Sequence, residues 1–94
     1  DGICGYEKSG EFSTSKGSEW EMFDAGIATQ TFCLAAHDKG VGTVILGIFD
    51  DAKVGEIAGI PEGQTVAAVV AMGYPAFAPE MPPRKSVDDL LTVK

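Results

Sequence analysis

Apolar and small residues recur at helical spacing in the first half of the chain. One stripe holds Trp20, Phe23, Ile27, Thr31 and Leu34, and beside it lie Ala28, Phe32, Ala35 and Ala36. This spacing predicts a helix from about Glu19 to Lys39 that is buried on more than one side. Ser18 and Glu21 have the spacing of a capping box at its start, and Gly40 is suited to end it.

After this helix the pattern changes to short apolar runs separated by glycine and proline. Residues Val41–Phe49 are rich in β-branched side chains with inset glycines, which predicts a short strand or an extended segment. Asp50 is expected to cap a short helix over Asp51–Ala58, and Gly59 is expected to end it.

The last third of the sequence predicts one strand and a long arm. Glu62–Gly63 is typical of a turn. Thr65–Met72 lacks polar alternation, so it predicts a strand that is buried on both faces. Proline-rich Ala76–Pro83 should be extended, and Ser86 with Asp89 can cap a final helical turn.

Several of these elements need neighbours that the sequence does not supply. Asp1–Tyr6 resembles the end of a strand with nothing before it to pair with, and Glu7–Gly17 is typical of a polar surface loop. A helix that is apolar on several sides cannot be covered by two or three strands. We therefore expect the chain to be part of a fold, with Trp20, Phe23 and Ile27 facing another chain or a space that another segment fills.

Composition limits the classes of partner. The chain has 94 residues, 14 acidic and 7 basic, with a net charge of −7. This balance argues against nucleic acid or an anionic membrane as the main partner, because both require a basic patch. The longest apolar run, Val66–Met72, is far shorter than a bilayer span. Two cysteines without a metal-binding spacing indicate a reducing, cytoplasmic setting.

Two groups of residues are weak candidates for acid–base or metal chemistry. His37 is the only histidine, and no nucleophile or carboxylate pattern marks it as part of a catalytic triad. The adjacent carboxylates Asp50 and Asp51 are more typical of a helix cap than of a metal site. We predict no metal site and no dedicated catalytic side chain.

Two other segments can contact a ligand, although each also has a purely structural interpretation. The glycines of Gly40–Gly47 would let a flat ligand lie close to backbone N–H groups, or they would simply belong to a core strand with a tight entry turn. Arg84 and Lys85 follow a rigid proline-rich arm and can bind a phosphate, or they can form a solvated charge pair.

Taken together, the blocks of the sequence resemble the C-terminal half of the nitroreductase family of FMN enzymes. The residues that carry this resemblance are Asp24–Gln30, Leu34–His37, Gly40–Gly47, Ile60–Gly63, Gly73–Pro75 and Arg84–Lys85. The resemblance implies an α+β fold with a central, mostly antiparallel sheet flanked by helices. Residues 1–94 would form the C-terminal portion of one such domain, with residues 76–94 as an extended arm. It also implies a homodimer that binds FMN at the subunit interface.

The resemblance further implies roles for particular residues. Val44, Ile45, Leu46 and Gly47 would run along the flavin ring, with the amides of Leu46 and Gly47 at its edge. Arg84, and more weakly Lys85, would bind the FMN phosphate. The missing N-terminal half of the family's fold would be needed as a partner.

The implied activity is ping-pong hydride transfer from NAD(P)H through FMN to a small electron-poor acceptor such as a nitroaromatic or a quinone. Two alternatives remain open. One is a flavin-dependent dehydrogenase or dehalogenase on the same scaffold, and the other is a non-enzymatic acidic dimerisation module.

Overall fold

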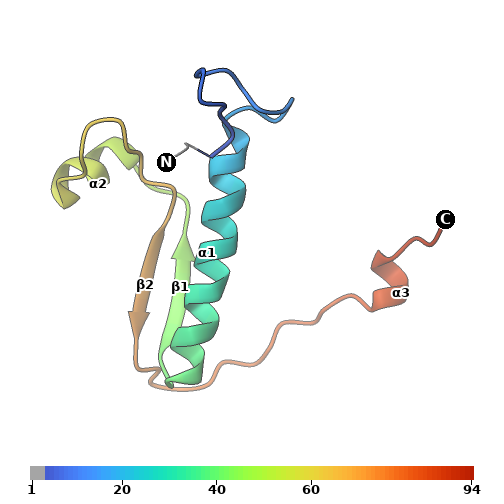
Figure 1. The fold of residues 1–94 in the computed structure, drawn as a ribbon. Coiled ribbons are helices and arrows are strands. Elements are labelled where there is room, and N and C mark those ends of the chain that lie inside the picture. The colour runs from blue at the N-terminus through green and yellow to red at the C-terminus, as the bar shows by residue number, and fades with distance from the viewer. Residues whose placement is uncertain (1–3) are drawn as a thin grey trace.

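The computed structural model describes residues 4–94, and Asp1, Gly2 and Ile3 of the expected N-terminal strand end lie outside them. In chain order, the elements are α1 (Glu19–Asp38), β1 (Gly42–Leu46), α2 (Asp51–Ala58), β2 (Val69–Gly73) and α3 (Val87–Leu90). The long helix α1 runs beside the two strands, α2 lies beyond one end of them, and the C-terminal arm leaves from the other end (Figure 1).

The helix α1 confirms the predicted helix to within one residue, but the predicted capping box at its start is wrong. Ser18 has helical backbone angles, and its hydroxyl makes no capping hydrogen bond. The amides of Glu19 and Glu21 instead donate to the carbonyls of Lys16 and Ser18, both at 3.1 Å. Because consecutive turns lead into the helix, these amides are satisfied by backbone and the hydroxyl is not needed.

Both longer helices end in the same way. After α1, the amide of Gly40 donates to His37 and that of Val41 to Ala36, which is the hydrogen-bond pattern of a Schellman motif. Gly40 has φ +75°, a conformation that glycine adopts without strain. Gly59 ends α2 with φ +66°, again as predicted.

The short helix α2 has the predicted bounds and the predicted cap. Asp50 Oδ1 accepts a hydrogen bond from the amide of Lys53 at 3.1 Å, and Asp50 Oδ2 lies 3.2 Å from Lys53 Nζ. At the other end, Ile60 folds back onto Gly55, where an added Cβ would lie 3.0 Å from Ile60 Cδ1. These contacts stabilise both ends of α2 through residues that are close to it in the sequence.

The strands β1 and β2 form an antiparallel two-stranded sheet, in which Gly42 pairs with Gly73 and Leu46 with Val69. The second strand begins four residues later than Thr65, where the sequence predicted its start. The reason is that β1 ends at Leu46, so the residues before Val69 have no strand to pair with. The residues of β2 are half-buried or exposed, so the described residues do not supply the cover on both faces that the apolar pattern of this strand calls for.

One layer of helix, α1, packs against β1, and the contact leaves most apolar side chains uncovered. Among the described residues, Ala36 is the only buried hydrophobic residue. The chain exposes 8523 Å², whereas a compact protein of this mass exposes about 5,200 Å². Its radius of gyration is 17.6 Å, against about 12 Å for a compact chain of this length. Phe23 and Ile27 are exposed, as predicted.

The polar loop before α1 is ordered around aromatic contacts. Tyr6 and Phe12 form an isolated antiparallel bridge, and their ring centroids lie 5.1 Å apart. Trp20 Nε1 donates to Thr14 Oγ1 at 2.7 Å, so this loop partly covers the Trp20 side chain that was expected to face outward.

The C-terminal arm is extended, as predicted, and ends in α3. Within residues 4–94, α3 contacts no other helix or strand. It is held by a capping box in which Ser86 Oγ accepts from the amide of Asp89 at 3.2 Å and the amide of Ser86 donates to Asp89 Oδ2 at 3.1 Å. The sequence predicted this box.

Candidate functional site

Three of the four ring-contact residues predicted from the sequence, Val44, Ile45 and Leu46, lie on β1. Ile45 helps line a hollow together with α1. Because side chains alternate along a strand, Val44 and Leu46 point to the opposite face, where both are exposed. Gly47 follows directly after the strand, so the predicted segment runs from the sheet into irregular backbone.

The segment that follows β1 has backbone donors without acceptors. In the part of the chain that the structure describes, the amides of Gly47, Ile48 and Phe49 donate to no backbone or side-chain acceptor. A Cβ built on Gly47 would meet no atom within 4 Å. Exposed donors beside open space suit a ligand whose flat edge carries hydrogen-bond acceptors. The sequence pointed to Gly47, but it contained nothing that singled out the amides of Ile48 and Phe49.

Arg84 and Lys85 lie far along the chain from these amides. The arm that carries them begins beyond Gly73, which pairs with Gly42 at the start of β1, whereas Gly47 follows the end of β1. The arm then runs away from the sheet toward α3 (Figure 1). Within residues 4–94, the one recorded ion pair joins Lys53 and Asp50, so neither Arg84 nor Lys85 is neutralised by a neighbouring carboxylate.

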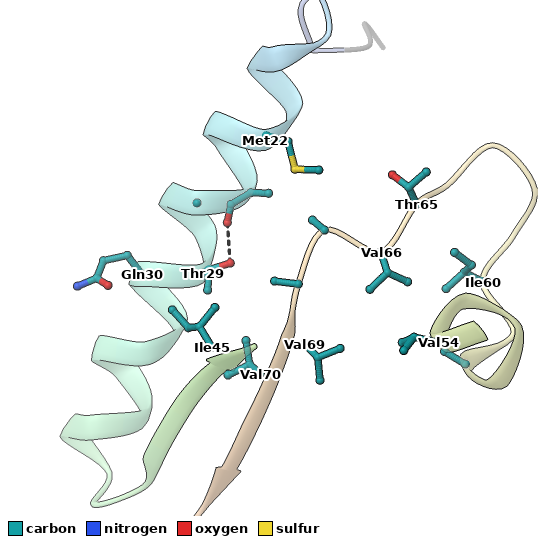
Figure 2. A pocket seen from close by; sticks show the side chains of 15 residues that line it. Met22, Thr29, Gln30, Ile45, Val54, Ile60, Thr65, Val66, Val69 and Val70 are labelled. Atoms are coloured by element: carbon teal, nitrogen blue, oxygen red, sulfur yellow. Dashed lines mark hydrogen bonds between the residues drawn. The ribbon is translucent and has the colours of Figure 1, made fainter. Parts of the chain in front are cut away.

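The hollow that Ile45 helps line has a volume of about 670 Å³ and lies between α1, α2 and the segment before β2. Figure 2 shows Met22 and Thr29 on the α1 side, Val54 and Ile60 on the α2 side, and Val66 between them. Its lining is mostly apolar, and the Thr29 hydroxyl is already used, because it donates to the carbonyl of Ala25 at 2.7 Å. The hollow therefore suits an apolar protein segment better than a polar ligand.

The titratable groups of the described residues form neither a nucleophilic nor a metal-binding site beside the free amides. Cys4 Sγ donates to Asp24 Oδ2 at 2.8 Å, and this hydrogen bond raises the pKa of the exposed Cys4 thiol. A thiol with a raised pKa is a poor nucleophile at neutral pH. No cluster of three or more His, Cys, Asp or Glu residues suited to a metal occurs between residues 4 and 94. Over the same stretch, no helix is long and apolar enough to cross a bilayer.

A comparison with known protein families finds a match that runs from the first loop to the end of β2. Residues 5–74 match the nitroreductase family. The chain belongs to the nitroreductase family. Arg84 and Lys85 lie outside the matched residues, so this match leaves their predicted role untested.

Two curated proteins are similar to this chain in sequence. The chain is 38% identical over 63 residues to the NADPH-flavin oxidoreductase of Vibrio harveyi, an alignment that spans 65% of this chain and 26% of that protein. It is 39% identical over 56 residues to a putative NADH dehydrogenase/NAD(P)H nitroreductase of Archaeoglobus fulgidus, with 55% of this chain and 32% of that protein covered.

A solved structure confirms the predicted fold class. The nitroreductase family protein from Streptococcus pneumoniae TIGR4 superposes on 89% of this chain with a TM-score of 0.81 and 26% sequence identity. The chain covers 42% of that structure, and it spans about a quarter to a third of the curated relatives it matches. The α+β nitroreductase fold predicted from the sequence is therefore correct, and this chain supplies part of it.

Proposed function

We propose that the protein containing this chain is an FMN-dependent NAD(P)H oxidoreductase that reduces nitroaromatics, quinones or similar electron-poor acceptors. The observation that carries the proposal is the run of free amides at Gly47–Phe49 in a chain of the nitroreductase family. The names of the relatives, an NADPH-flavin oxidoreductase and a putative NAD(P)H nitroreductase, support the same reaction class.

The residues present fit a flavin ring. Gly47 has open space where a side chain would stand, so a flat ring can approach its backbone closely. A bound flavin would supply the redox chemistry, accepting a hydride from NAD(P)H and passing it to the acceptor. Backbone N–H groups at the ring edge would stabilise negative charge there, which is how this chain would favour reduction. No acid or base side chain is required from residues 4–94.

We further propose that Arg84, assisted by Lys85, binds the FMN phosphate, because a guanidinium group can donate two parallel hydrogen bonds to phosphate oxygens. The chain alone does not bring these residues to Gly47, because the arm starts at the opposite end of β1. In a homodimer, Gly47 of one chain and Arg84 of the other could contribute to the same flavin site. Such an assembly also accounts for the large exposed surface and for an arm that contacts no other element.

We also propose that residues 1–94 belong to the C-terminal portion of a single nitroreductase-like domain, with residues 76–94 as its extended arm. The remainder of that domain would be an N-terminal half outside this sequence. We also place the protein in the cytoplasm, because Cys4 and Cys33 are both free thiols.

The test is to substitute Gly47 in the intact protein. Gly47→Val should fold, because neither its surroundings nor its backbone angles oppose a side chain. It should nevertheless bind FMN at least about tenfold more weakly, since a branched side chain separates the ring from the amides. The measurements are flavin absorbance after desalting and NAD(P)H oxidation with a nitroaromatic or quinone acceptor.

Gly73→Val is the matched control, because Gly73 also lies in open space at the other end of the same sheet. It should retain FMN. A folded Gly47→Val protein with full FMN affinity would remove the proposed contact. A colourless wild-type protein that binds no added FMN would favour the non-enzymatic module.

A further inference from the structure

We draw no further inference here: the strongest candidate, the mostly apolar hollow between α1, α2 and the segment before β2, carries none, because nothing in the described residues 4–94 shows what covers it.

Discussion

The region from α1 to β2 and the C-terminal arm both contain local structure that the sequence predicts, but they differ in what positions them. In the first region, α1 packs on β1 and β1 pairs with β2. In the arm, α3 has a complete capping box and yet contacts no other element of the described chain. Local hydrogen bonds therefore determine what each segment forms, and only long-range contacts determine where it lies.

The proposed flavin site is divided between these two regions. Its ring-binding part, Gly47–Phe49, is attached to the packed region, and its phosphate-binding part, Arg84 and Lys85, is on the arm. A substitution in one region should therefore weaken binding of the ring or of the phosphate without affecting the other.

The largest effect is expected when the 94-residue chain is produced alone. Each fully buried large side chain contributes roughly 1.5–3 kcal/mol, and this chain leaves many of them exposed, Phe23 and Ile27 included. Their exposure outweighs the net stability of a small domain. The chain should therefore aggregate or stay unfolded and bind no FMN, as measured by size-exclusion chromatography, thermal melting and flavin absorbance.

Co-expression with the N-terminal half of a nitroreductase-like domain is the control, and it should recover a yellow dimer. A soluble monomer of the 94-residue chain that melts cooperatively would contradict the prediction. It would show that the packed region is stable without further cover.

A smaller effect is expected from Arg84→Ala on the arm. Hydrogen bonds to charged groups contribute about 1.5–3 kcal/mol, so the loss of this contact should weaken FMN binding about ten- to a hundredfold. Riboflavin lacks the phosphate and should bind wild type and variant equally. Turnover should return at excess FMN. Lys94→Ala, which removes a positive charge at the end of the same arm, should change none of these quantities.

The result for riboflavin decides what Arg84 does. An equal loss of FMN and riboflavin affinity would place the arginine on the ring or in folding. In that case the arm would belong to the packed region after all, and the division between the two regions would be wrong.

The sequence predicted the parts of the structure that depend on near neighbours. Gly59 at the end of α2, Asp50 at its start and the Ser86–Asp89 box were all correct, because each depends on residues within one helical turn. Ser18 was wrong for a local reason, since preceding turns already supply acceptors for the first amides of α1. The start of β2 was wrong for a distant reason, because the end of β1 determines it.

The candidate site was predicted only in part for the same reason. A glycine inset in an apolar run indicates close approach to the backbone, which pointed to Gly47. Whether the next two amides are free depends on how far β2 pairs with β1, and the sequence does not contain that information. The place of Arg84 relative to Gly47 depends on the position of the whole arm, which no local pattern determines.

The smallest effect concerns the pH dependence of α3, the one helical turn in the arm. The hydroxyl and the amide of Ser86 donate to the Asp89 carboxylate, and these hydrogen bonds lower the pKa of Asp89 in the folded turn. A lowered pKa means that the folded turn favours the ionised carboxylate. Its contribution is therefore present above about pH 4, the ordinary carboxyl range, and is lost as the pH falls through the lower folded value.

Because α3 contacts no other described element, a synthetic peptide of residues 76–94 is a suitable sample. The amide chemical shifts of Ser86 and Asp89 should report a capped turn at neutral pH and its loss in acid. Asp89→Ala should remove the turn and its pH dependence at every pH. Asp88→Ala should keep both, because in the described chain Ser86 exchanges hydrogen bonds with Asp89 rather than with Asp88. A pH dependence that survives in Asp89→Ala would show that the arm is ordered by something other than its own capping box.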